Sequence, residues 1–216
     1  MTGLEGPERG PAAGGGARQL VVLLHGLGAN GRDLIELADP WSQVLPHAAF
    51  VAPDGPEPCE GVPFGRQWFA LWDRTPEQLE AGARAAAGML DPFLDAALVR
   101  RGLAPDAYVL MGFSQGAMMA LHVGLRRPVG PRAILAYSGA LLAHEVLAAE
   151  LANTAPVLLV HGEDDPVVPV GYSRMTEEAL RAAGVPVEAH FVPGLAHGID
   201  PTGLAAGAGM LRRAFR

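Results

Sequence analysis

Short runs of apolar residues alternate with longer segments of helical periodicity along most of the chain. The apolar runs are continuous rather than alternating, they are rich in Val, Leu and Ala, and several of them end in glycine. This pattern is typical of strands that are buried on both faces. The strands predicted in this way cover residues 19–26, 48–58, 106–113, 132–139, 155–162 and 187–194.

Helical patterns fill the intervals between many of these strands. The longest one has Thr75 as a candidate N-cap, Pro76 at the first helical position and Gly102 at its end. Pro92 is expected to kink this helix or to begin a second one. The predicted helices cover residues 75–102, 114–127, 171–184 and 202–215.

Strands separated by helices predict an α/β fold with a mostly parallel sheet and helices on both faces. Residues 18–216 contain no internal repeat and no segment of distinctly different composition, so we expect one domain there. Residues 1–17 are rich in Gly and Pro and poor in large apolar side chains. We expect this segment to be a disordered leader.

The charge balance narrows the classes of partner. The chain has 216 residues and a formal net charge of −7, and no basic patch stands out. This argues against binding to nucleic acid or to an anionic membrane surface. The 16 basic residues are all Arg, and the lack of Lys excludes Schiff-base chemistry at a lysine.

Cysteine usage and hydropathy bear on the compartment. Cys59 is the single cysteine, so an intrachain disulfide is impossible and a reducing compartment fits. No apolar run reaches the roughly 18 residues that a membrane span needs. The first residues also lack the apolar core of a signal peptide. We therefore expect a cytoplasmic protein without stable membrane insertion.

The segment GFSQG at residues 112–116 lies between a predicted strand and a predicted helix. This is the context of a nucleophile elbow, a sharp turn that presents a serine above the sheet. Gly112 and Gly116 remove Cβ atoms that would clash in the turn, so Ser114 can adopt a strained backbone. The N–H groups at the start of the following helix favour a developing oxyanion. The alternative is a glycine-rich turn with an incidental serine.

A catalytic serine needs a base, and the base needs a carboxylate that orients it. In elbow proteins the order along the chain is serine, acid, histidine. Asp164 and Asp165 both follow the strand 155–162, and His197 lies in a glycine-flanked loop after the last strand. Active-site loops gather at this end of a parallel sheet.

The other histidines offer weaker alternatives for the base. His25 and His161 each precede a glycine at a strand end and could line a cleft. His190 lies inside the last strand, where a packed and hydrogen-bonded side chain is the simpler account. Surface or packing roles are expected for His47, His122 and His144.

An oxyanion hole also needs a donor from a loop after an early strand. The segment LLHGLGANGRDL at residues 23–34 has glycines that let the backbone approach a substrate carbonyl. We expect the N–H groups of Leu27 and Gln115 to be the two donors. A phosphate-binding loop is the alternative, but the segment does not fit G-x-G-x-x-G and there is no Walker lysine.

In this order, these segments resemble bacterial serine esterases of the α/β-hydrolase superfamily. The closest resemblance is to the phospholipase/carboxylesterase group, which includes the acyl-protein thioesterases, and it extends from about residue 18 to the C-terminus. The motifs that carry it are LLHGLGANGRDL, FVAPDGPEP, WF at 68–69, GFSQGAMMAL, SG at 138–139, HGEDDPVVP and GLAHGI.

The resemblance implies an α/β-hydrolase fold without a separate cap domain and a hydrolase that uses no metal or organic cofactor. It implies Ser114 as nucleophile and His197 as base. It favours Asp165 over Asp164 because the family's acid stands directly before the Pro-Val-Val-Pro segment. The oxyanion donors map to Leu27 and Gln115. Rivals are a dienelactone hydrolase, which has cysteine at the elbow, another hydrolase on this fold and a catalytically silent binding module.

The substrate side of the site is less defined. An apolar cluster in residues 66–72 is expected either to form a wall or lid over an acyl group or to pack beneath the loop. We expect a short- to medium-chain carboxylic ester or a thioester as substrate, and family habit suggests a homodimer. Thioesterases of the group commonly have an acidic residue after Trp-Phe, where this chain has Ala70. The candidate substrate-binding residues are Trp68, Phe69, Leu71, Trp72, Val167 and Leu195.

Overall fold

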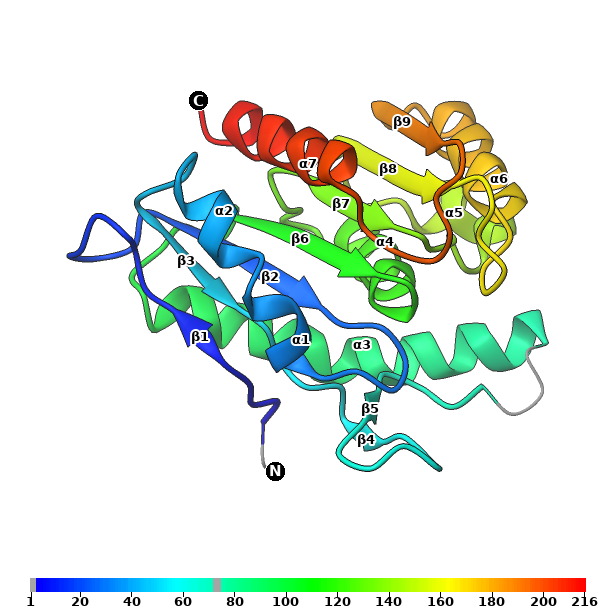
Figure 1. Cartoon of the computed structure of the whole chain (residues 1–216), viewed down its shortest axis with the longest axis horizontal. Coiled ribbons are helices and arrows are strands. Elements are labelled where there is room, and N and C mark those ends of the chain that lie inside the picture. The colour runs from blue at the N-terminus through cyan, green and yellow to red at the C-terminus, as the bar shows by residue number, and fades with distance from the viewer. Residues whose placement is uncertain (1–2, 72–74) are drawn as a thin grey trace.

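The computed structural model describes residues 3–71 and 75–216. A seven-stranded sheet forms its centre, with the strand order β1-β3-β2-β6-β7-β8-β9 (Figure 1). All neighbouring pairs are parallel except β1 and β3, which are antiparallel. The strands are β1 (Glu8–Arg9), β2 (Gln19–Leu24), β3 (Ala48–Val51), β6 (Tyr108–Phe113), β7 (Ile134–Tyr137), β8 (Val157–Gly162) and β9 (Val187–Val192).

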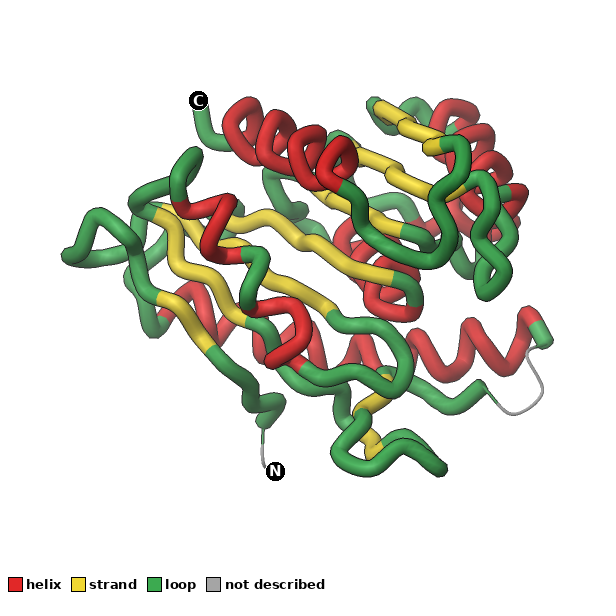
Figure 2. The backbone as a smooth tube through the Cα atoms, viewed as in Figure 1, coloured by secondary structure: helices red, strands yellow, loops and turns green. Residues whose placement is uncertain are grey.

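Helices cover both faces of this sheet, as the tube in Figure 2 also shows. Leu20, Val22 and Leu24 of β2 face one core, and Val21 and Leu23 face the other. The first face carries α3 (Pro76–Val99), α4 (Gln115–Arg126), the 3₁₀ turn η1 (His144–Val146), α5 (Leu147–Glu150) and α6 (Gly171–Ala182). The second carries α1 (Gly31–Ile35), α2 (Ala38–Ser42) and α7 (Pro201–Ala214).

The mostly parallel sheet with helices on both faces, expected from the sequence, is confirmed. The central strands are buried because each one packs between two helical layers, which explains their continuous apolar runs. Within the described ranges, no separate cap domain stands over the sheet.

Of the two outcomes expected at Pro92, a kink or the start of a second helix, the structure excludes the second. Helix α3 continues through Pro92 as one element and ends at Val99, so no second helix begins at the proline. Its buried side chains recur every three or four residues, which fixes one face on the sheet. These side chains are Ala83, Ala86, Leu90, Leu94, Ala97 and Leu98.

The N-terminal segment also differs from the expectation of a disordered leader. Glu8 and Arg9 form β1 and pair with Val51 and Phe50 at the edge of the sheet. The pairing supplies backbone hydrogen bonds that composition does not reveal, and Glu8 forms ion pairs with arginines at the end of α3. The segment thus covers an edge strand that would otherwise expose unpaired backbone groups.

Short elements complete the fold. Strands β4 (Glu57–Pro58) and β5 (Arg66–Gln67) form a small antiparallel sheet of their own. Backbone hydrogen bonds join Gly28 N–H to Arg66 O and Arg66 N–H to Ala29 O, so β5 is fastened to the loop after β2. This places the hairpin at the carboxyl ends of the central strands.

Candidate active site

Ser114 lies in the sharp turn between β6 and α4. Its φ and ψ of 55° and −117° are unusual for a residue with a side chain, and its N–H donates to Tyr137 O on the next strand. The packing around the turn holds Ser114 in this strained backbone conformation. Strained residues of this kind are common at functional sites. Within the described part of the chain, its hydroxyl makes no helix-capping bond, although Ser114 occupies the N-cap position of α4.

The two glycines of the elbow are required by close backbone contacts. A Cβ on Gly112 would lie 2.1 Å from the carbonyl oxygen of Gly116. A Cβ on Gly116 would lie 1.9 Å from the carbonyl oxygen of Leu24, on the neighbouring strand. Because both obstacles are backbone atoms, a side chain at either position cannot be accommodated by a rotamer change. The spacing of the motif therefore follows from the turn itself.

Asp165 follows β8 and is held from two sides. Its Oδ1 accepts hydrogen bonds from the N–H groups of Val167 and Val168, at 2.8 and 2.9 Å. Its Oδ2 lies 2.6 Å from Nδ1 of His197. Burial alone would raise the pKa of Asp165, but the bonds from His197, Val168 and Val167 outweigh it and the pKa is lowered. The carboxylate is therefore ionised near neutral pH.

His197 lies in the loop between β9 and α7, and its ring packs against the ring of Phe113 with centroids 4.8 Å apart. Phe113 directly precedes Ser114, so this contact brings the imidazole to the elbow. With Nδ1 bonded to a carboxylate, the neutral ring carries its lone pair on Nε2. Such a ring can accept a proton from a neighbouring hydroxyl.

The loops of the acid and of the histidine are joined through their backbones. Glu163 N–H donates to Val192 O, and Asp164 N–H donates to Leu195 O. A Cβ on Gly162 would lie only 2.1 Å from that same Leu195 oxygen, so the histidine loop rests directly on the end of β8. Of the two candidate carboxylates, Asp165 meets His197, whereas Asp164 is exposed.

The alternative histidines have other partners. Nε2 of His25 accepts from Gly55 N–H at 2.8 Å, and its Nδ1 lies 2.7 Å from Gly26 O. Burial lowers the pKa of His25, which keeps the ring neutral in this role. His190 pairs with Glu188 on the last strand. His161 bonds to Val168 O and Ser173 Oγ and lies behind Asp165.

The loop after β2 lies against the elbow from the other side. A Cβ on Gly26 would meet the Ser114 Cβ and a ring carbon of Phe113 at 3.3 Å. Leu27 follows, and its side chain is 41% exposed. Gln115 begins α4, where backbone N–H groups have no acceptor in the helix. The structure therefore places both candidate oxyanion donors near the elbow, Leu27 in the loop after β2 and Gln115 at the start of α4.

The side chain of Gln115 has a role that the sequence did not reveal. Its Oε1 accepts from Trp68 N–H at 2.9 Å and its Nε2 donates to Phe69 O at 2.7 Å. The amide thus fastens residues 68–69 to the first turn of α4. No local pattern could indicate a partnership that spans 46 residues. Phe113, in contrast, could have been noted from its place next to the serine.

The candidate substrate-binding residues divide into two groups. Trp68 and Phe69 are 1% and 2% exposed and belong to the core. Of the two arrangements expected for this cluster, these residues therefore adopt the one in which they pack beneath the loop. Leu71 is half-buried, and Trp72 lies outside the described residues. Near the acid and the histidine, Val167 is 60% exposed, and Leu195 is half-buried.

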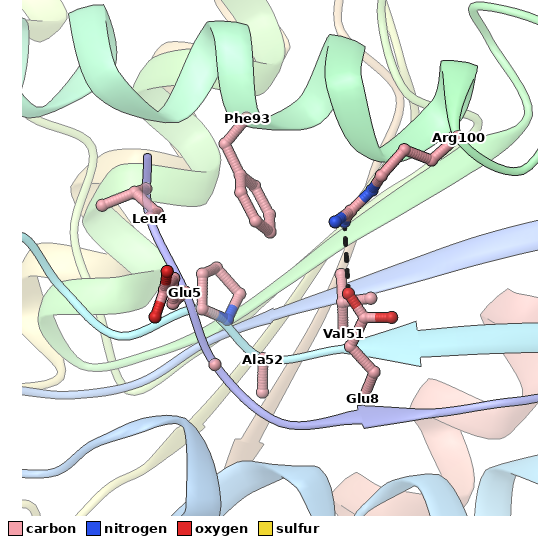
Figure 3. A pocket seen from close by; sticks show the side chains of 9 residues that line it. Leu4, Glu5, Glu8, Val51, Ala52, Phe93 and Arg100 are labelled. Atoms are coloured by element: carbon pink, nitrogen blue, oxygen red, sulfur yellow. Dashed lines mark hydrogen bonds and ion pairs between the residues drawn. The ribbon is translucent and has the colours of Figure 1, made fainter. Parts of the chain in front are cut away.

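A cavity of about 310 Å³ lies away from these residues, between the N-terminal segment and α3 (Figure 3). Leu4, Phe93 and Val51 contribute apolar side chains, and an ion pair joins Arg100 to Glu8 across it. None of the candidate catalytic residues lines this cavity.

Two features are absent from the part of the chain that the structure describes. Within the ranges 3–71 and 75–216, no group of three or more His, Cys, Asp or Glu side chains is arranged to hold a metal ion. In the same ranges, no helix combines the length and the apolar character needed to cross a membrane.

Comparison with known proteins shows several relatives that are similar to this chain over most of its length. The esterase YpfH of Escherichia coli is 32% identical over 188 residues, which cover 85% of this chain and 78% of that protein. Acyl-protein thioesterase 1 of Schizosaccharomyces pombe is 34% identical over 69% of each chain. The crystal structure of esterase PE8 has a TM-score of 0.94 and 43% identity, and the match covers 99% of this chain and 100% of that one.

A more distant structure shares the fold alone. SOBER1 of Arabidopsis thaliana is 23% identical, with a TM-score of 0.76 over 93% of this chain and 100% of that one. The α/β-hydrolase fold expected from the sequence is confirmed by these neighbours. The family model described as "Phospholipase/Carboxylesterase" matches residues 12–212. The chain therefore belongs to the phospholipase/carboxylesterase family.

Proposed function

We propose that this protein is a serine carboxylesterase in which Ser114 is the nucleophile, His197 the base and Asp165 the orienting acid. The observation that carries the proposal is the 2.6 Å bond between Asp165 and His197, on an imidazole packed against the residue before Ser114. This bond fixes the tautomer that leaves Nε2 as a proton acceptor. Family membership supports the same chemistry.

The reaction has two acyl-transfer steps. Nε2 of His197 takes the hydroxyl proton as Ser114 Oγ attacks the ester carbonyl, and Asp165 stabilises the imidazolium that forms. The tetrahedral intermediate collapses, the C–O bond to the leaving group breaks, and the imidazolium gives its proton to the departing alcohol. Water then attacks the acyl-serine with the same base, which releases the acid and restores the serine.

The oxyanion of each intermediate is bound by the N–H groups of Leu27 and Gln115. The positive end of the α4 dipole adds to this stabilisation. Removal of one donor of this kind typically costs on the order of 10²–10³ in kcat. The Gln115 side chain, anchored to Trp68 and Phe69, keeps its own backbone in register with Ser114.

We propose short- to medium-chain carboxylic esters as substrates, with thioesters as a second class. Relatives named as esterases and as acyl-protein thioesterases support both. Val167 and Leu195, which flank the acid and the base, form the rim that contacts the substrate, and Leu71 contributes from the other side. Trp68 and Phe69 act indirectly, since the core encloses them.

The rival functions are not favoured. A dienelactone hydrolase would have cysteine at the elbow, whereas Cys59 lies in the β4–β5 hairpin and position 114 is serine. A silent binding module would have no need for a carboxylate bonded to a histidine beside a strained serine. The single thiol fits a reducing compartment such as the cytoplasm. The homodimer stays an expectation.

A serine-directed fluorophosphonate tests the proposal. We expect one probe molecule per chain, located at Ser114 by peptide mapping, and no labelling of Ser114→Ala. Ser42→Ala, at the last residue of α2, is the matched control and should label normally. A panel of nitrophenyl esters and matched thioesters of increasing chain length then measures the acyl preference. Full labelling of Ser114→Ala would overturn the assignment.

A further inference from the structure

A second histidine lies behind the Asp165–His197 pair. His161 is the penultimate residue of β8, and its side chain is 0% exposed, as is that of Asp165. Its Nε2 lies 2.8 Å from Val168 O and 3.2 Å from Asp165 Oδ2. Its Nδ1 lies 2.6 Å from the hydroxyl of Ser173 on α6. The mechanism described above does not use this ring.

The contacts of His161 determine which nitrogen carries the proton. Nε2 faces a carbonyl oxygen and a carboxylate oxygen, and both of these only accept hydrogen bonds. Nε2 is therefore protonated and donates toward both. Burial lowers the pKa of His161, so near neutral pH the ring is neutral and its one proton is the one on Nε2. Nδ1 is then an acceptor that faces the Ser173 hydroxyl, whose single proton also faces the Gly139 carbonyl at 2.9 Å. The ring is fixed as a donor that faces the acid.

This donor supports the carboxylate of Asp165 by two routes. It contacts Oδ2 directly, on the oxygen that also receives His197. It also holds the carbonyl of Val168, whose own N–H donates to Oδ1. Both oxygens of the acid thus depend on one buried imidazole, either directly or through the loop at 167–168.

We propose that His161 is a positioning residue that holds the carboxylate of Asp165 in the orientation that receives His197 Nδ1. The effect on catalysis rests on the proposed function. The positioning itself concerns only the hydrogen bond between Asp165 and His197, which can be observed without any activity. Loss of the donor leaves Oδ2 with a single partner and frees the 165–168 loop. His197 then loses its fixed orientation toward Ser114.

Side-chain replacements separate this role from simple packing. His161→Gln keeps an N–H donor near the Nε2 position, whereas His161→Asn reaches only the Nδ1 position and His161→Leu has no donor. Thr176→Val is the matched control. Thr176 lies on α6 one turn after Ser173 and is buried like His161. Its hydroxyl bonds to Leu141 N–H and Tyr172 O and not to His161. All four substitutions replace a buried side chain.

Two readouts are measured on each folded variant. The first is the low-field proton NMR signal of the His197 Nδ1–H that bonds to Asp165, which does not depend on catalysis. The second is the separation of kcat from KM with a nitrophenyl ester. We expect the signal to be kept in His161→Gln and Thr176→Val and to be lost in the Leu and Asn variants. In those two, kcat should fall on the order of 10²-fold with little change in KM.

The outcomes distinguish the inference from the proposed function. Equal behaviour of the Gln and Asn variants, or a Leu variant with an unchanged signal, overturns the positioning role. If the Leu variant does not fold, the Gln and Asn pair decides. A wild-type protein that shows the signal and its loss in the Asn variant, yet does not label at Ser114, supports the positioning and refutes the esterase assignment.

Discussion

Nε2 of Gln115 donates a hydrogen bond of 2.7 Å to the carbonyl of Phe69, which lies 46 residues earlier in the chain. The Oε1 atom of the same amide accepts from the N–H of Trp68. Gln115 is 2% exposed, so water cannot replace either partner. One side chain next to the nucleophile therefore closes the loop that carries the WF pair onto the first turn of α4.

The first prediction concerns these two hydrogen bonds of the Gln115 side chain, which we call the Gln115 clamp. Gln115→Met has similar length but leaves the Trp68 N–H and the Phe69 carbonyl buried without partners. Each such group costs about 1–3 kcal/mol, so the free energy of unfolding should fall by at least that amount. Urea denaturation measures it. Gln78→Met, on the exposed first turn of α3, is the control and should change little; equal losses in the two variants would contradict the clamp.

The second prediction concerns the elbow glycines. Gly116→Ala places a methyl group 1.9 Å from Leu24 O, a backbone atom that cannot move aside. Overpacking of this kind costs about 1–3 kcal/mol, and we expect the upper end or more, with loss of esterase activity. Thermal unfolding provides the measurement.

A glycine with open surroundings is the control for that variant. Nothing lies within 4 Å of a Cβ on Gly88, inside α3. Gly88→Ala should stabilise the protein by about 0.5–1 kcal/mol through helix propensity. A Gly116→Ala protein as stable as the wild type would show that the elbow is less tightly packed than described.

These two cases show what a sequence can and cannot indicate. The elbow was predictable because a local turn demands glycines at fixed positions around Ser114. The Gln115 clamp was not, because it depends on how residues 68–69 return to the sheet. The same reason hid β1, whose two residues have no periodicity and gain their structure from pairing with β3. The sequence left two roles open for Trp68 and Phe69, because an apolar cluster in a loop has the same composition whether it lines a site or fills a core.

The third prediction concerns Asp165. Burial opposes ionisation, but the bonds from His197, Val168 and Val167 win and lower the pKa of this carboxyl below its usual 3.8. Its contribution to stability is therefore present above pH 3.8 and is lost as the pH falls through the folded-state value. Asp165→Asn removes the contribution and should also lower kcat on the order of 10⁴-fold, because the amide favours the wrong tautomer of His197.

Melting temperatures of the wild type and Asp165→Asn between pH 7 and pH 3 provide the test. The difference between the two proteins should be constant near neutrality and shrink below pH 3.8. A difference that does not depend on pH would mean that the folded and unfolded chains hold this proton equally.

The fourth prediction concerns His122, on the buried side of α4. Burial and the positive charges of Arg126 and Arg84 lower its pKa from 6.5 to about 4. The unfolded chain binds this proton first, so stability falls as the pH drops from about 6.5 to about 4. A separation of this size corresponds to about 3 kcal/mol.

His122→Leu should flatten that decline. The flattening is partial, because burial also lowers the pKa of His25 and His161, so these two rings contribute to the same loss of stability at acidic pH. At pH 7 the variant should be at least as stable as the wild type, since Nδ1 of His122 is buried with no partner among the described residues. Urea denaturation at several pH values checks both statements, and an unchanged slope would contradict them.

The central claim is that the hydroxyl at the elbow carries the acyl group, and trapping of that intermediate tests it most directly. The enzyme is mixed with excess nitrophenyl acetate, quenched in acid within the first turnovers and examined by intact mass and peptide mapping. We predict a gain of one acetyl group per chain, on the peptide that contains Ser114, and none in Ser114→Ala. An acetyl group on another residue, or undiminished ester hydrolysis by Ser114→Ala, would contradict the account.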